Sequence, residues 1–453
     1  MEPKKKIFKW IAAVAATIFV LLLILILVVP HVVDMTPYKE KALAEISRAI
    51  KGKADFQDAR IGFFPRPHLE IDHGMVSVPG ETDAVVESLA IFPEILPLFR
   101  GDVRVYRLQI EGPTLTINLP DAVGQPKEKR SDMDVAFGER LRSGLAHISS
   151  IVPGLVLVVK NGNLNFTRDK APAFWFKNIH ALIKCPPDRL EMDLECESSF
   201  WKRILLKGSA DPEKLESFGQ LELLNFQPRG IVDIFLPSFK RYLGDSELNL
   251  NLNFKTDGPG VLQADMQGSI PRLTLYPESK KQVIRGKRFK GAVSFTEEKQ
   301  SITLTELDLD HPRANLSGQF QMDRKTPKVS LDLVGRDIDV APARSMTTAL
   351  VGDVPVVQTI FDIVKDGNVP LIRFHSRGTS LSDLGSLKNM VIEGSLNKGN
   401  IFVPTAELDL RDVSGDVTIS NGVLEGKNLN AVLGNSSGHD GTLKLCLGKE
   451  NPL

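Results

Sequence analysis

Apolar and polar residues alternate with a period of two along most of the chain. The alternation is strict over Leu190–Cys196, Leu248–Phe254 and Leu316–Met322, and shorter stretches at Val329–Leu333 and Val417–Ile419 repeat it. A strand with this pattern has one apolar face and one wet face, which is typical of antiparallel sheets. We therefore expect a series of amphipathic antiparallel strands.

The predicted strands recur about every dozen residues and are joined by turns rich in Gly, Asn, Asp and Pro, with few helices between them. This spacing excludes a doubly wound α/β body. The sequence predicts a mainly β (α+β) fold: an elongated, curled antiparallel sheet or groove with a few short helices. Within Ile302–Leu309 the alternation changes phase at Thr305 and Glu306, which predicts a β-bulge that turns the strand.

A weak internal repeat is present in the second half of the chain. An apolar, helix-like stretch lies between two alternating strands at Ile231–Leu243 and again at Ala343–Val364. The two copies are separated by roughly 110 residues, a period that indicates a supersecondary unit used twice.

The N-terminus has the pattern of a membrane anchor. Lys4, Lys5, Lys6 and Lys9 precede the segment from Trp10 to Val29, which is apolar except for Thr17. A helix of this length spans a hydrocarbon core of about 30 Å, and the preceding lysines place the N-terminus in the cytoplasm. A cleaved signal peptide is the alternative, but its apolar core is shorter, about 7–15 residues. Trp10 and Val29 are the expected ends of the anchor, and the rest of the chain is expected across the membrane.

Beyond the anchor the sequence predicts one amphipathic helix and then short strands. Tyr38–Ile50 has apolar residues at helical spacing. We expect this helix to pack over the end of a sheet, with a position at the membrane face as the alternative.

Five landmarks follow one another in the first 120 residues: Asp34–Tyr38, Lys51–Lys53, Gly62–Pro67, Ile95–Gly101 and Gly112–Leu115. In this order they resemble the start of the AsmA family of inner-membrane-anchored periplasmic proteins. The resemblance implies a β-groove with a role in lipid traffic or outer-membrane assembly, and a single-pass inner-membrane protein whose bulk lies in the periplasm. Beyond about residue 120 the chain shares only its high content of β-strand with the family, and a fragment of a longer member is an alternative to a complete chain.

The predicted organisation has five parts. They are a basic cytoplasmic tail (1–9), the transmembrane anchor (10–30), an AsmA-like module (31–122), a polar linker or loop (123–143) and a repetitive β-rich body (144–453).

The composition limits the classes of partner, the number of membrane spans and the disulfides that the chain can form. Lysine plus arginine number 56 and aspartate plus glutamate 56, so nothing in the charge points to nucleic acid. Hydrophobic residues make up 42% of the chain, and no second run reaches the length of a membrane span. Cysteines number three, which cannot all pair internally. Cys185 and Cys196 form either one disulfide or two buried thiols, and both possibilities stay open at this stage.

The sequence holds no catalytic motif such as GxSxG, HExxH or a phosphate-binding loop, so we expect no enzyme, no catalytic residue and no cofactor. His68, Glu70 and Asp72 would share one face of a strand, where a metal site is conceivable. An exposed polar strand face explains the same residues better, so we expect no metal. The basic segment Glu278–Lys290 is expected to be a solvated loop, with contact to anionic lipid headgroups as the alternative.

A sheet with a continuous apolar face must close into a sandwich, lie under helices or leave an apolar trough. A trough would suit phospholipid acyl chains, since each buried methylene contributes about 0.8 kcal/mol without directional contacts. Together with what the resemblance to the AsmA family implies, the expected function is non-enzymatic handling or transfer of phospholipid between the inner and outer membrane. The candidate lipid-facing residues are Leu248, Leu250, Leu252, Phe254, Leu316, Phe320 and Met322. The alternatives are a closed core without a groove, and a scaffold for outer-membrane protein assembly that binds its partners by strand edges.

Overall fold

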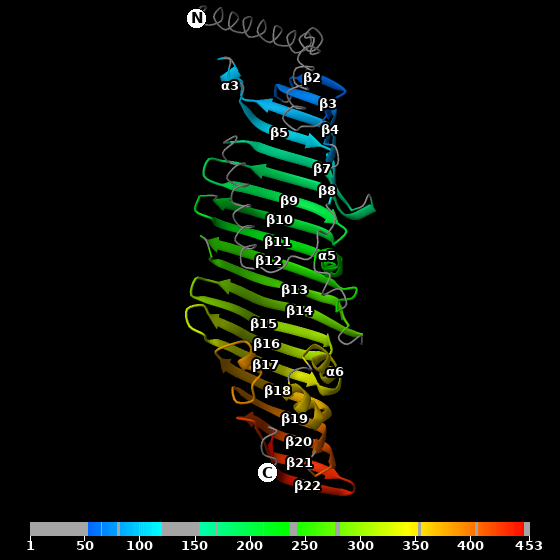
Figure 1. The fold of residues 1–453 in the computed structure, drawn as a ribbon, viewed down its shortest axis with the longest axis vertical. Coiled ribbons are helices and arrows are strands. Elements are labelled where there is room, and N and C mark those ends of the chain that lie inside the picture. Colours follow the sequence, from blue (N-terminus) through cyan, green and yellow to red (C-terminus); the bar gives the residue numbers. More distant parts are fainter. Residues whose placement is uncertain are drawn as a thin grey trace, which may run out of the picture. The chain divides into compact units, whose positions relative to one another are not determined.

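The structure, a computed structural model, consists mainly of β-strands (Figure 1). It describes residues 53–119, 154–235 and 242–447, apart from gaps at 65, 79–81, 99, 101, 103, 169–170, 212, 259, 277–280, 352–354 and 404–405. The chain divides into two compact units. Unit 1 contains residues up to Ser199 together with Ser209–Glu213, and unit 2 contains Phe200–Gly208 and Lys214–Leu453.

Unit 1 is a sheet with one short helical turn. Its elements are β1 (Lys53–Asp55), β2 (Asp58–Gly62), β3 (His68–Val78), β4 (Thr82–Pro93), α3 (Ile95–Leu98), β5 (Val105–Glu111), β6 (Thr114–Asn118), β7 (Val156–Arg168), β8 (Ala171–Lys184) and β9 (Leu190–Ser198). The strands predicted in the first 120 residues are therefore confirmed. β10 (Trp201–Asp211) contains the boundary between the two units.

Most strand pairs in unit 1 are antiparallel, as the alternation predicts. β3 pairs with β1, β2 and β4, and β7 pairs with β8. β5 and β6 depart from this rule, because both pair with β7 in parallel.

Unit 2 is an antiparallel meander. From β11 onward each strand pairs with the next one in the chain. The elements are β11 (Glu216–Phe226), α5 (Pro228–Phe235), β12 (Glu247–Asp257), β13 (Leu262–Leu275), β14 (Gln282–Phe295), β15 (Lys299–His311), β16 (Arg313–Asp323), β17 (Val329–Asp339), α6 (Val340–Val351), α7 (Pro355–Ile363), β18 (Val364–Gly378), η3 (Ser382–Gly385), β19 (Met390–Val403), β20 (Leu408–Ser420), β21 (Val423–Leu433) and β22 (Ser436–Cys446).

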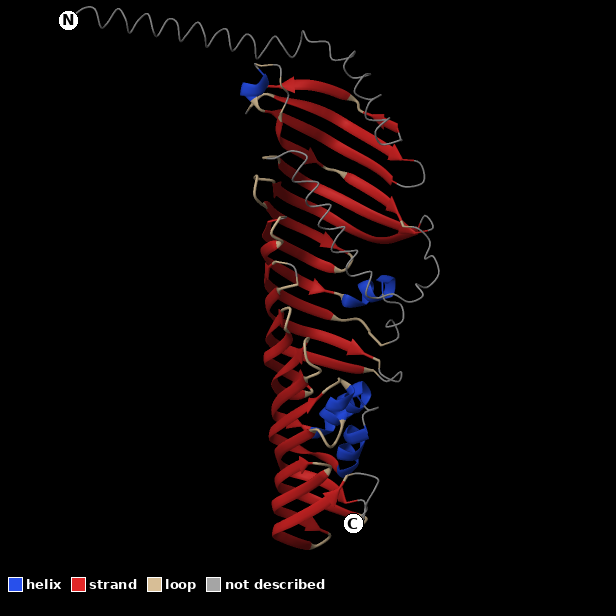
Figure 2. Cartoon of the chain, turned by 60° about the vertical axis from the view of Figure 1, so that its left-hand side comes forward, coloured by secondary structure: helices blue, strands red, loops and turns tan. Residues whose placement is uncertain are grey.

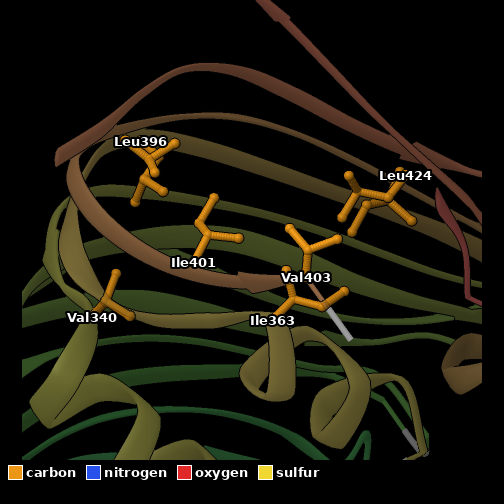
Figure 3. Packing of buried hydrophobic residues seen from close by; sticks show 8 residues of the cluster. Val340, Ile363, Leu396, Ile401, Val403 and Leu424 are labelled. Carbon is orange, nitrogen blue, oxygen red and sulfur yellow. The ribbon is translucent and has the colours of Figure 1, made fainter. Parts of the chain in front are cut away.

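β-Bulges bend many strands of unit 2. In β15 the register shifts where the sequence predicts a bulge, since Glu306 pairs with Lys290 whereas Leu304 pairs with the next residue, Gly291. Left-handed residues mark other irregularities, for example Lys398 in β19 and Asp412 in β20, with φ of 51° and 49°. A bulge increases local twist and bends its strand. Accordingly the strands around α6 and α7 are curved (Figure 3).

The internal repeat is confirmed at the level of secondary structure. α5 connects the antiparallel neighbours β11 and β12, and α6 with α7 connects β17 and β18. The helices lie on one side of the unit 2 sheet (Figure 2). The copies differ in size, since α5 has 8 residues whereas α6 and α7 have 12 and 9.

Several sequence predictions fall outside the described residues. These are the anchor with Trp10 and Val29, the amphipathic helix Tyr38–Ile50, and the divisions at 122 and 144. Among the helices that the structure does describe, none is both long and apolar enough to cross a bilayer. The membrane anchor therefore stays a prediction from the sequence.

Candidate apolar binding site

The seven residues predicted to face lipid all lie on one face of the unit 2 sheet. Four alternate along β12 and three along β16, in the order Leu248, Leu250, Leu252, Phe254 and then Leu316, Phe320, Met322. Phe254 and Phe320 are joined by a line of direct cross-strand partners that passes through β13, β14 and β15. Residues directly opposite one another project from the same face. The structure thus brings the predicted residues together on a surface that we call the apolar face.

Three rows of cross-strand partners form this face. The first row, across β11 to β22, is Leu221, Leu252, Met266, Gly291, Leu304, Gly318, Leu333, Phe374, Ile392, Ile419, Leu424 and Leu445. The second row, across the same strands, is Leu223, Leu250, Gly268, Phe289, Leu307, Leu316, Gly335, Ile372, Gly394, Val417, Gly426 and Leu443. The third row, across β11 to β19, is Gly219, Phe254, Ala264, Val293, Ile302, Phe320, Leu331, Ser376 and Met390. The rows contain no charged residue.

Glycines in the rows are covered by the side chains of their neighbours. A methyl group added at Gly219 would overlap the Phe254 ring, and one added at Gly268 would overlap the Phe289 ring. The aromatic rings therefore lie across the glycine backbone of the adjacent strand, as in other sheets where an aromatic residue covers a glycine. The result is an apolar surface that continues across positions without side chains.

Over β12–β17 the residues of the apolar face are only half-buried. All seven predicted residues have intermediate exposure, and two of their row neighbours are exposed: Ile302 at 47% and Leu333 at 41%. An extended apolar surface of this kind is uncommon on soluble proteins and usually marks a binding site.

Over β18–β22 the apolar face lies beneath α6 and α7. Val340 and Ile363 at the ends of this helical pair pack with Leu396, Ile401 and four other buried residues in one core cluster. Figure 3 shows the labelled side chains of this cluster pointing into the space between the helices and the curved strands. A second, smaller cluster joins Leu316 to Met346 of α6. The closed-core alternative therefore fits this part of unit 2.

A cavity of about 300 Å³ lies beneath α6 and α7. Its walls combine the first and second rows, from Ile372 to Leu443, with Ala343, Ile360 and other residues of the two helices. Among its lining side chains only Thr347 and Ser395 are polar, and none is charged. The half-buried surface and the cavity thus share the same rows of residues.

The opposite face of the sheet is polar, and several of its charges are paired across strands. The segment Glu278–Lys290 was expected to be a loop, and this prediction was wrong, because β14 occupies Gln282–Phe295. Lys287 contacts Asp310 at 2.8 Å and Arg288 contacts Glu306 at 2.6 Å. The acidic residues of β15 offset the positive charges, so the basic residues fit on a strand.

His68, Glu70 and Asp72 all have protein partners. Arg60 contacts Glu70 at 3.0 Å and Asp72 at 3.4 Å, and the hydrogen bond to Glu70 raises the pKa of the Arg60 guanidinium. The His68 ring stacks on Phe92 with centroids 4.9 Å apart. Within the described ranges there is no group of three or more His, Cys, Asp or Glu that could hold a metal ion.

Cys185 and Cys196 are both buried, and no disulfide joins them. In the register of β8 and β9, Lys184 pairs with Glu191 and His180 with Glu195, so Cys185 and Cys196 lie about six residues apart along the strands. At about 3.3 Å per residue they are separated by roughly 20 Å, far beyond the reach of a disulfide. Cys185 exposes only 2% of its surface, and its burial raises the pKa of its thiol. Of the two possibilities, the structure has the buried thiols.

Sequence reasoning missed the residues of the cavity. The alternation at Val417–Ile419 was recognised as a strand, but it carries no sign that helices from residues 340–363 lie over it. Ile392 and Leu424 were missed for the same reason. The apolar character of both connecting helices is the one signal in the sequence that could have located this site.

Comparison with protein-family models, curated proteins and solved structures gave no match for this chain.

Proposed function

We propose that this chain is a non-enzymatic, membrane-anchored envelope protein that binds phospholipid acyl chains on the apolar face of unit 2 and transfers lipid between the inner and outer membrane. The observation that carries the proposal is the set of three uncharged rows, half-buried over β12–β17 and continuous with an apolar cavity. An acyl chain matches such a surface, because its binding free energy comes from burial of methylenes and requires no polar partner.

The sequence supports the cellular setting of the proposal. The predicted anchor would hold the chain in the inner membrane with its N-terminus in the cytoplasm and its bulk in the periplasm. The resemblance of residues up to about 120 to the AsmA family points to the same setting. Membership of that family is part of the proposal.

The test is native mass spectrometry of the full chain extracted in a mild detergent, with analysis of bound lipid. We expect phospholipid at a fixed stoichiometry in the unaltered protein and its loss in Leu250→Asp, which places a carboxylate on the apolar face. Asn251→Asp is the matched control, since it adds the same charge one residue away on the polar face. Circular dichroism verifies that both variants remain folded.

Two outcomes would contradict lipid binding: an unaltered protein without lipid, or a folded Leu250→Asp variant that keeps it.

Strand-edge binding of a partner chain is the second candidate function, and β22 is the feature that favours it. Among the described residues β22 pairs only with β21, and Ser436 to Asp440 are exposed. An unpaired edge can accept a further strand from a partner, such as an outer-membrane assembly protein. Thr442→Pro would prevent that pairing and leave lipid content unchanged, whereas Leu250→Asp would leave partner binding unchanged.

A further inference from the structure

The cavity beneath α6 and α7 differs from the rest of the apolar face in being covered on both sides. The sheet supplies one wall through residues such as Ile392 and Val417, and the helices supply the other through Ala343 and Ile360. At its edges Val340 and Ile363 are almost fully buried, at 5% and 3% exposure. A ligand part that enters here lies between two apolar walls, whereas one on β12–β17 lies against a single surface.

We propose that this cavity is a terminal pocket for one unbranched acyl chain and that its size sets the length of chain that is bound most favourably. The inference rests on the proposed function and adds a location and a length limit to it. A methylene takes about as much space as a water molecule in the liquid, about 30 Å³, so a cavity of about 300 Å³ holds on the order of ten methylenes.

The chemistry of the lining selects a hydrocarbon chain over a peptide. A peptide segment would bring amide groups that need hydrogen-bond partners, and an unpaired buried amide is costly. Only Thr347 and Ser395 offer polar side chains in the lining, too few to satisfy a peptide backbone. A lipid headgroup is excluded by the same argument, so the methyl end of the chain enters the pocket.

Glycines create the space in the sheet wall. In the second row Gly394 and Gly426 alternate with Ile372, Val417 and Leu443. The three atoms nearest to a methyl group added at Gly426 all belong to the Leu429 side chain, which can move. A larger side chain at this position would therefore fill the cavity without a clash against the backbone.

The experiment uses the full chain in an amphipathic polymer. A fluorescent fatty acid is displaced by saturated fatty acids from about eight to about eighteen carbons, and affinity should rise about fourfold per methylene, the equivalent of about 0.8 kcal/mol. We expect this rise to become much shallower once the pocket is full, at on the order of ten methylenes. A fatty acid with a diazirine at its methyl end should label α6, α7 and β19–β21.

Gly426→Leu and Ala343→Leu fill the pocket from opposite walls. Both should shorten the fatty acid at which the rise in affinity levels off, which we call the break. Ile360→Ala should move the break to longer fatty acids. Gly438→Leu is the matched control, because Gly438 lies on β22 with open space around its α-carbon. Two independent filling variants keep the test valid if one of them fails to fold.

The outcomes separate this inference from the function on which it rests. If no fatty acid of any length binds, the proposed function fails. If chains bind and Leu250→Asp abolishes binding, but the affinity shows no break and the filling variants have no effect, only the terminal pocket is overturned. A filling variant that stabilises the fold and leaves the length dependence unchanged would identify the cavity as a packing void.

Discussion

Two parts of unit 2 are built from the same alternating strands and differ in what covers them. Over β18–β22, Ile419 and Leu424 of the rows are buried at 3% and 5% exposure and pack in one core cluster with Val340 of α6 and Ile363 of α7. Over β12–β17 the same rows stay half-buried, and Ile302 is 47% exposed. Alternation therefore determines that a strand has an apolar face, and the connecting helices determine whether that face becomes core or surface.

The two copies of the strand–helix–strand repeat account for this difference. Among the described residues the first copy carries α5, and a methyl group added at Gly230 of this helix would overlap the buried Phe200 ring. The second copy carries two helices of 12 and 9 residues, long enough to contact β16 through β19. The longer connecting helices of one copy thus cover part of the apolar face.

The largest effect on stability is expected when an isoleucine is replaced by alanine in each of the two parts of unit 2. Ile363→Ala should lower the free energy of unfolding by about 2–5 kcal/mol, because it leaves a cavity in a closed core. Ile302→Ala should lower it by about 1 kcal/mol or less, since almost half of that side chain is already in water. Urea denaturation followed by circular dichroism measures both. Equal losses would mean that the two parts are covered to the same degree.

A smaller effect on the free energy of unfolding is expected where the rows of the apolar face pack tightly within the sheet. Gly318→Ala should cost about 1–3 kcal/mol, because the added methyl group would overlap the Asp332 carbonyl oxygen and the Leu333 side chain. Gly438→Ala, at an open position of another strand, is the control and should change stability little. The same denaturation experiment compares them, and a tolerated Gly318→Ala would show that the half-buried part of the face is loosely packed.

The smallest effect on stability is expected from an ion pair on the polar face of β21 and β22. Lys444 donates a hydrogen bond of 2.9 Å to Glu425, and this bond, followed by charge attraction, lowers the pKa of Glu425 below its ordinary value. Because the folded-state pKa is lowered, the pair stabilises the fold above the unfolded-state value of about 4.3. The contribution is lost as the pH falls through the folded-state pKa.

NMR titration of the Glu425 carboxyl group measures this pair. Lys444→Gln should return its pKa toward the ordinary value, and Lys427→Gln should move it less, because Lys427 acts only through a weaker charge attraction. An unchanged midpoint in Lys444→Gln would contradict the assigned cause.

The sequence predicted the strands, the bulge and the residues of the apolar face because each depends on local order. Strict alternation over Leu248–Phe254 requires that its leucines and phenylalanine share a face, whatever their partners are. The phase change at Thr305 and Glu306 requires a bulge for the same reason. The segment Glu278–Lys290 was misread, because its charges are acceptable on a strand only when a neighbour supplies acids, and pairing with Asp310 and Glu306 is not visible in the segment itself.

By itself the sequence determined that the chain forms amphipathic strands, where their apolar residues lie and where helices interrupt them, since these properties follow from side-chain periodicity. Only the tertiary structure decided which strands pair, that Cys185 and Cys196 lie too far apart for a disulfide, and that two helices enclose a cavity over β18–β22. These outcomes depend on register and on contacts between residues distant in the chain. Periodicity within a strand carries no information about what packs against it.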